Sequence, residues 1–146
     1  MSDESTCYLD TSALAKWYLN EAGSEAVSRY IQELDVAVIS QLTTVEMRSL
    51  LARRRRMGDI ETTLESTIFA AFQDDIALGH LQLYPVEASL WPGAANLITR
   101  YPEHPLKTLD ALHLTIVRHY NIELLATADR VMAKVAEATG IMVELF

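Results

Sequence analysis

The sequence predicts an α/β fold in which a central, mostly parallel sheet of about five strands lies between helices on both faces. Short apolar and β-branched runs alternate along the chain with longer segments of helical periodicity. Because helical segments separate the strands, consecutive strands are joined by crossovers, which favours parallel pairing in a three-layer α/β/α arrangement. A chain of 146 residues, half of them hydrophobic, can bury one substantial core, so we expect a single domain over residues 1–146.

The expected strands are short and apolar, or alternate between apolar and polar residues. Residues 7–10 form a brief apolar run that ends at Asp10, and residues 36–39 form a continuous run typical of a strand covered on both faces. Residues 81–86 alternate and include Tyr84. In chain order, we expect strands at 7–10, 36–39, 81–86, 123–127 and 142–146.

The expected helices are bounded by capping and breaking residues. Thr11 and Ser12 are suited to cap the first helix, and Gly23 separates it from the second. Pro92 and Gly93 indicate a break or a fresh start inside the fifth helical segment. In chain order, we expect helices at 13–20, 24–34, 44–57, 59–78, 87–101, 109–120 and 129–139.

Charge and composition exclude several classes of protein. A net charge of −8 argues against binding nucleic acid through a broad basic face, but not against an enzyme that meets phosphate through bound cations. The single cysteine, Cys7, excludes an internal disulfide and suits a reducing compartment. Residues 1–6 lack a secretory pattern, and no apolar run approaches the roughly 18 residues that span a bilayer. We therefore expect a cytoplasmic protein with no membrane association.

Four acidic residues occupy corresponding places in the predicted fold. Asp10 ends the first strand and Asp129 follows the fourth. Glu46 is expected in the first turn of the helix after the second strand, and Asp110 opens the helix after a proline-bounded loop. Functional groups in parallel sheets gather beyond the carboxyl ends of the strands, so we expect the four acids at one edge.

Such a cluster requires a cation. Two carboxylates about 6 Å apart repel each other by roughly 3 kcal/mol at an effective dielectric near 20. A hard divalent ion with oxygen ligands relieves this repulsion. The chain has no cysteine–histidine cluster with zinc spacing, so Mg²⁺ or Mn²⁺ is the expected ion.

Each acid also has a purely structural interpretation. Glu46 would pair with Thr43 in a capping box. Asp110 and Asp129 would complement helix dipoles as first-turn acids, and Asp10 would be a turn residue. These interpretations are reasonable for any one acid alone, whereas the coincidence of all four favours a functional site.

Four segments of the chain resemble the motifs of a known family. Residues 8–14 (YLDTSAL) and 44–50 (TVEMRSL) resemble the first two motifs of PIN domains, particularly those of VapC toxins from toxin–antitoxin pairs. Residues 106–114 (LKTLDALHL) resemble the third motif, which is specific, and residues 125–129 (LATAD) resemble the fourth, with Gly140-Ile141 after it. The motifs occur in the right order over nearly the whole chain.

This resemblance implies a magnesium- or manganese-dependent endoribonuclease that hydrolyses RNA phosphodiester bonds with a metal-activated water. It implies Asp10 and Asp110 as the main metal ligands, and Glu46 and Asp129 as the acids that complete the catalytic pocket, Asp129 also contributing to the metal. Ser12 and Thr127 would be hydroxyl partners of these acids. The implied partners are RNA, a small VapB-like antitoxin and a second copy of the chain in a homodimer.

Other interpretations stay open at this point. A degenerate PIN domain could serve as a binding or scaffold module. Receiver-type and dehalogenase-type phosphotransfer domains also place an Asp after the first strand, but the dehalogenase pattern needs a second Asp where Ser12 stands, and the acidic pair and lysine of receivers are absent. His113 is expected in the core or beside the acids rather than on the metal. The run at 53–56, four arginines, is either a solvated helix end or a surface for RNA or antitoxin.

Overall fold

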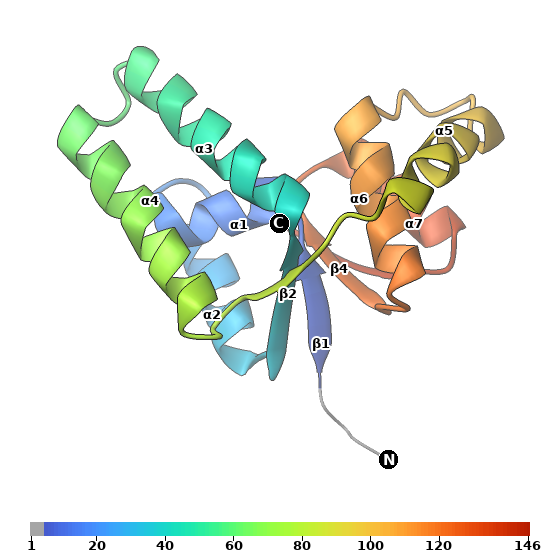
Figure 1. Cartoon of the computed structure of the whole chain (residues 1–146), viewed down its shortest axis with the longest axis horizontal. Coiled ribbons are helices and arrows are strands. Elements are labelled where there is room, and N and C mark those ends of the chain that lie inside the picture. Colours follow the sequence, from blue (N-terminus) through green and yellow to red (C-terminus); the bar gives the residue numbers. More distant parts are fainter. Residues whose placement is uncertain (1–4) are drawn as a thin grey trace.

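A computed structural model describes residues 5–146 as a parallel sheet between two helical layers (Figure 1). The first four residues, part of the segment in which we predict no secretory signal, lie outside the described residues. The strand order is β3-β2-β1-β4-β5, and every neighbouring pair is parallel. The strands are β1 (Thr6–Leu9), β2 (Val36–Ser40), β3 (Gln82–Tyr84), β4 (Leu124–Thr127) and β5 (Met142–Leu145). The predicted sheet is thereby confirmed, although β3 is shorter than expected.

The helices cover both faces of this sheet. They are α1 (Thr11–Tyr18), α2 (Ser24–Glu33), α3 (Gln41–Arg56), α4 (Thr62–Ala77), the 3₁₀ turn η1 (Ala88–Leu90), α5 (Trp91–Arg100), α6 (Thr108–His119) and α7 (Arg130–Ala138). Helices α1 to α4 enclose one core and α5 to α7 the other (Figure 1). The central strand β1 serves both cores by alternation, since Cys7 and Leu9 face the first and Tyr8 the second. No helix within residues 5–146 is long and apolar enough to cross a bilayer.

Helix α3 begins three residues earlier than the sequence indicates. Ser40 and Thr43 form the capping box, and the Ser40 N–H donates to Thr43 Oγ1 at 3.2 Å. The helix therefore starts at Gln41 and places Glu46 in its second turn. The expectation that Glu46 lies in the first turn and caps with Thr43 is wrong, which leaves the Glu46 side chain available for another role.

Two other helix starts also differ from expectation, whereas a third matches it. Asp10, rather than Thr11 or Ser12, is the N-cap of α1. Helix α4 begins at Thr62 rather than residue 59, after a turn through Gly58, whose φ of +82° suits glycine. Pro92 lies in the first turn of α5, where proline needs no backbone donor, so the helix makes a fresh start there, which is one of the two outcomes expected from the sequence.

Helices α3 and α4 form an arm held by a buried carboxylate. Glu65 of α4 accepts from Arg48 Nη2 at 3.0 Å and from Arg55 Nε at 2.7 Å, both on α3. Its side chain is only 5% exposed, so the two guanidinium groups replace the water that the charge has lost. Burial opposes ionisation, but these two arginines hold the pKa of Glu65 below its ordinary value. The arm is therefore a fixed element beside the sheet.

Helices α5 and α6 approach each other closely at Gly93. A Cβ atom on Gly93 would lie 2.9 Å from Thr115 Cγ2, which is shorter than side chains tolerate. Replacing a helical glycine with alanine ordinarily stabilises a protein by roughly 0.5–1 kcal/mol. Overpacking of this kind costs typically about 1–3 kcal/mol, so here the steric cost decides the sign.

We therefore predict that Gly93→Ala lowers the free energy of unfolding by about 1 kcal/mol or more, as measured by urea denaturation. Thr115→Ser removes only the clashing methyl group and keeps the hydroxyl that donates to the Ala111 carbonyl at 2.8 Å. The double variant should be at least as stable as Thr115→Ser alone. A Gly93→Ala protein more stable than wild type would show that α5 and α6 are not in this close contact.

Candidate active site

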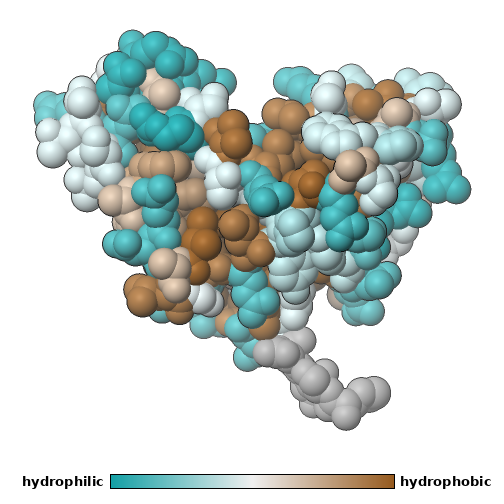
Figure 2. Space-filling model, viewed as in Figure 1, coloured by the Kyte–Doolittle hydropathy of each residue, from teal (hydrophilic) through white to brown (hydrophobic). Residues whose placement is uncertain are grey.

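All four predicted acids line one pocket of about 510 Å³ beyond the carboxyl ends of the strands. Asp10 follows β1 and Asp129 follows β4, while Glu46 comes from α3 and Asp110 from α6. The pocket lies between the arm and the α5–α6 side of the molecule, and Figure 2 shows a notch with hydrophobic surface in this region. The topology thus brings together acids from four separate parts of the chain.

Asp10 is the most enclosed of the four acids, at 3% exposure. Its Oδ1 accepts from Ser12 Oγ at 2.7 Å and from the Ala13 N–H at 3.0 Å, and its Oδ2 accepts from Thr127 Oγ1 at 2.6 Å. Burial nevertheless raises the pKa of Asp10, although these donors and the nearby His113 oppose the rise. Hydroxyl and backbone N–H groups orient this carboxylate, and no lysine or arginine within residues 5–146 forms an ion pair with it.

The two hydroxyl groups that hold Asp10 also join β4 to α1. Ser12 Oγ accepts from the Ala128 N–H at 2.9 Å, and Thr127 Oγ1 accepts from the Asp129 N–H at 2.9 Å. The two oxygens lie 3.4 Å apart. Ser12 and Thr127 therefore fix the ends of both central strands relative to each other, and through them the positions of Asp10 and Asp129.

A buried chain of hydrogen bonds holds Glu46. His113 Nε2 contacts Glu46 Oε1, while its Nδ1 lies 2.6 Å from the Tyr8 hydroxyl, which in turn lies 2.9 Å from Ser40 Oγ. An ionised carboxylate can only accept, so Nε2 of His113 must donate to it. The other ring nitrogen, Nδ1, completes the hydrogen bond with the Tyr8 hydroxyl. Thr11 Oγ1 donates to the same Oε1 at 2.9 Å.

This arrangement keeps Glu46 charged. Burial would raise its pKa, but the hydrogen bond and the charge of His113, with the Thr11 hydroxyl, hold the pKa below its ordinary value. All the described hydrogen bonds to this carboxylate fall on Oε1. Within residues 5–146, Oε2 therefore has no protein donor, and it belongs to a side chain that lines the pocket.

Asp110 and Asp129 complete the acidic wall from two helix N-termini. Asp129 caps α7, accepting from the Met132 N–H at 2.9 Å, and Asp110 lies in the first turn of α6. Burial, followed by the charges of Asp129 and Asp10, raises the pKa of Asp110 to about 6. Repulsion from the neighbouring acids therefore contributes to the raised pKa of Asp110 in the folded protein.

The donor set fits a hard divalent cation in its chemistry. The pocket offers carboxylate oxygens of mutually repelling acids, and no thiolate lines it. Across the part of the chain that the structure describes, no three Asp, Glu, His or Cys side chains are already gathered around one point as ligands. Binding a cation would thus require modest rotation of side chains, for which the partly exposed Asp110 and Asp129 have room.

No local pattern predicted which groups hold Glu46, and the sequence left the arginine run at 53–56 as either a solvated helix end or a binding surface. Tyr8 and His113 are separated by 105 positions, and no local pattern connects them. Arg53 and Arg56 also line the pocket. Their helical spacing from Glu46 was a usable signal, because residues seven and ten positions further on return to the same side of a helix.

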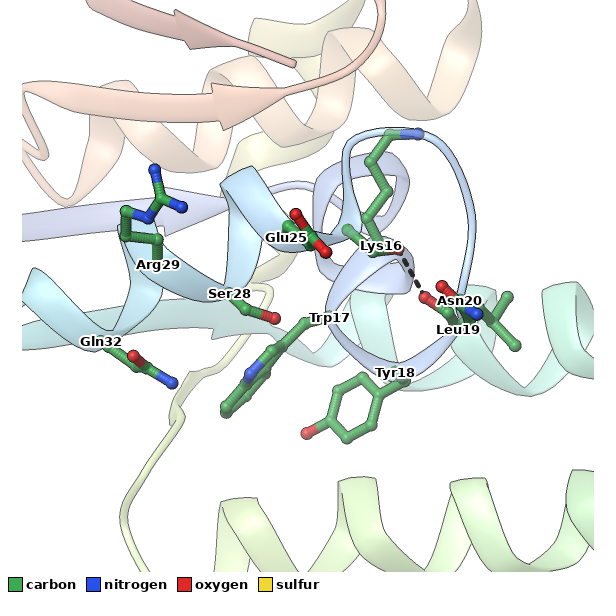
Figure 3. A pocket seen from close by; sticks show the side chains of 10 residues that line it. Lys16, Trp17, Tyr18, Leu19, Asn20, Glu25, Ser28, Arg29 and Gln32 are labelled. Carbon is green, nitrogen blue, oxygen red and sulfur yellow. Dashed lines mark hydrogen bonds between the residues drawn. The ribbon is translucent and has the colours of Figure 1, made fainter.

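A second hollow of about 500 Å³ lies between the end of α1 and α2 (Figure 3). Its lining includes Trp17, Arg29 and Lys16, and Lys16 is paired with Glu21 at 3.5 Å. None of the four acids reaches it. Trp17 packs against Tyr18 with ring centroids 5.1 Å apart.

The crowding at Asp110 gives a prediction with a definite sign. A carboxyl whose pKa is raised in the folded state is destabilising when ionised, so the penalty appears as pH rises from about 4 towards 6 and is complete above that range. A shift from 3.8 to about 6 corresponds to about 3 kcal/mol at full value, which partial exposure reduces to on the order of 1 kcal/mol. Asp110→Asn should therefore stabilise the metal-free protein by that amount near neutral pH.

The gain should vanish near pH 4, and thermal or urea unfolding in chelator at both pH values measures it. Glu25→Gln is the matched control, because Glu25 is an exposed first-turn acid of α2 outside the pocket. Its removal should instead cost roughly 0.3–1 kcal/mol. If Asp110→Asn is destabilised in the same way, the acids are ordinary helix-terminus residues.

Comparisons with known proteins agree with this architecture. The family model described as PIN domain matches residues 7–138. The chain is 32% identical over 139 residues to Ribonuclease VapC46 of Mycobacterium tuberculosis (strain ATCC 25618 / H37Rv), which covers 93% of this chain and 94% of that protein.

Solved structures share the fold. VapC20 of Mycobacterium tuberculosis, a sarcin–ricin loop cleaving toxin, superposes with a TM-score of 0.72 at 20% identity, covering 93% of this chain and 96% of that one. FitAcB from Neisseria gonorrhoeae gives a TM-score of 0.69 at 14% identity, covering 94% and 95%. VapBC2 from Rickettsia felis, bound to a promoter DNA fragment, gives 0.67 at 13% identity, covering 97% and 98%. Taken with the family-model match, these findings establish that the chain belongs to the PIN domain family.

Proposed function

We propose that this protein is a metal-dependent endoribonuclease that hydrolyses RNA phosphodiester bonds, and that it is the toxin of a VapBC-type toxin–antitoxin pair. The convergence of Asp10, Glu46, Asp110 and Asp129 on one pocket carries this proposal. The similarity to a VapC ribonuclease over almost the whole chain supports the choice of RNA as substrate. We also propose that residues 1–146 act as one nuclease domain.

Asp10, Asp110 and Asp129 would hold the cation, for which Mg²⁺ or Mn²⁺ suits an all-carboxylate donor set. A cation bound there would lower the pKa of its bound water and would neutralise charge on the phosphate. The protein contributes the orientation of the ligands. Ser12 and Thr127 fix both oxygens of Asp10, so that this carboxylate does not need to be reorganised when the site is loaded.

In this proposal Glu46 is the general base that accepts a proton from the attacking water. In the proposed reaction the water oxygen forms a bond to phosphorus, one P–O ester bond breaks, and the leaving oxygen takes up a proton. Glu46 Oε2 can accept the proton that the water loses, since His113 and Thr11 occupy only Oε1. Its low pKa keeps it ionised and ready to accept across the neutral range.

The pocket also suits a protein inhibitor. Structural neighbours include toxin–antitoxin complexes, such as VapBC2 of Rickettsia felis. Val45 and Leu109, both exposed apolar side chains, line the same pocket as the acids. A VapB-like antitoxin could cover this apolar surface and place a basic side chain among the carboxylates. A homodimer and a cytoplasmic location remain predictions from the sequence.

A catalytically degenerate scaffold is the alternative function. It would be favoured by the loss of an acid or of the groups that orient it. All four acids are present, and Asp10 and Glu46 are each held by several donors. The presence of all four acids and of their donors therefore supports a catalytically active nuclease over a degenerate scaffold.

The first activity prediction concerns metal dependence. The purified protein should cleave RNA in Mg²⁺ or Mn²⁺, lose cleavage in excess chelator, and regain it when Mg²⁺ is restored. Asp10→Asn should reduce the cleavage rate by at least about a hundredfold, because it removes a ligand charge, while the surface variant Glu25→Gln should match wild type. A panel of structured RNAs resolved on gels provides the measurement.

Equal cleavage by wild type and Asp10→Asn would indicate a contaminating nuclease. Wild-type cleavage that persists in chelator, once contaminants are excluded, would contradict a metal-dependent mechanism.

A further prediction concerns the chain of hydrogen bonds behind Glu46. Tyr8→Phe removes the hydroxyl that meets His113 Nδ1, and should lower kcat roughly ten- to hundredfold while the KM for RNA changes little. Tyr120→Phe is the matched control, because it removes a surface hydroxyl that, within residues 5–146, bonds only to the Pro85 carbonyl. Kinetics measured well below the melting temperature separate this effect from instability. If Tyr8→Phe leaves kcat unchanged, the chain does not orient Glu46.

A further inference from the structure

The four consecutive arginines at the end of α3 divide into two pairs. Arg54 donates to Glu21 at 2.7 Å and also lies 3.8 Å from Asp59, and Arg55 donates to the buried Glu65 at 2.7 Å. These two side chains connect α3 to the turn that follows α1, to the turn before α4 and to α4 itself. Their charges are already used inside the fold, so they are structural.

Arg53 and Arg56 are different. Both are exposed, neither makes an ion pair with any residue in 5–146, and both line the pocket that contains the acids. Helical geometry explains the division, because Glu46, Ser49, Arg53 and Arg56 follow one side of α3. At 1.5 Å per residue, the two arginines lie about 10 and 15 Å along the axis from Glu46.

We propose that Arg53 and Arg56 bind backbone phosphates of the RNA that flank the bond to be cleaved. The inference rests on the proposed function and adds to it a path for the substrate along α3. A guanidinium group pairs with phosphate through two parallel hydrogen bonds, and these two have no carboxylate partner to give up. The chain carries a net charge of −8, so a polyanion needs such a local positive surface to remain at the site.

RNA fits this surface better than a protein segment does. A basic side chain from a protein partner would pair with the acids and would leave Arg53 and Arg56 without a counter-charge. A phosphodiester chain is attractive to both ends of the pocket, to the arginines directly and to the acids once a cation is bound. Figure 2 shows hydrophilic residues at the outer end of the arm.

The test measures binding of a fluorescently labelled, single-stranded RNA of mixed sequence by anisotropy, in Mg²⁺ and over a series of KCl concentrations. The proteins carry Glu46→Gln to prevent cleavage. One also carries Arg53→Gln and Arg56→Gln, and the control carries Arg100→Gln and Arg118→Gln, which remove the same charge from exposed sites outside the pocket. Thermal melts establish that all three are folded.

Loss of two phosphate contacts should raise the Kd severalfold at low salt and reduce the slope of log K against log salt by about 1.4, while the control pair changes neither. Equal Kd values and slopes for the two double variants would overturn the proposal. So would weakened binding of a co-expressed antitoxin with no change for RNA, because the arginines would then serve the partner protein. Wild-type protein that binds the RNA but leaves it intact in Mg²⁺ would contradict the nuclease function and leave this inference standing.

Discussion

The structure depends on one buried carboxylate, Asp10, at the end of the central strand. Burying a charge is costly unless donors or a counter-charge replace water. Here two hydroxyls and one backbone N–H replace it, and those hydroxyls come from Ser12 at the start of α1 and Thr127 at the end of β4. The requirement to satisfy Asp10 therefore sets how two strands and a helix meet, and this junction becomes the floor of the acidic pocket.

The structural and functional interpretations of the acids are compatible. Asp10 and Asp129 are true N-caps, each accepting a backbone N–H of its helix. A cap uses only part of a carboxylate's acceptor capacity, so the same group can also serve a cation. The cost is seen at Asp110, where burial and then the charges of the neighbouring acids raise the pKa. An acidic cluster of this kind costs stability when no cation is bound, which is typical of a functional site.

The sequence was sufficient for the parts of the structure that follow from local patterns. The apolar run ending at Asp10 and the alternation of strands with helices predicted the parallel sheet and the edge at which the acids meet. The start of α3 was mispredicted because Thr43 and Glu46 match a capping box, whereas the buried strand end Ser40 makes the cap. The contacts of Tyr8 with His113 and of Arg54 with Glu21 join residues distant in sequence, and only the tertiary fold reveals them.

The central claim is that Asp10, Asp110 and Asp129 form one cation site, with Glu46 beside it. Anomalous diffraction from a crystal soaked in Mn²⁺ tests it most directly, because it locates the ion without reference to activity. The account predicts an anomalous peak in the pocket, within direct bonding distance of carboxylate oxygens of Asp10 and Asp110, with Asp129 turned towards it. A crystal saturated with Mn²⁺ that shows no peak in this pocket, or a peak only elsewhere, would contradict the account.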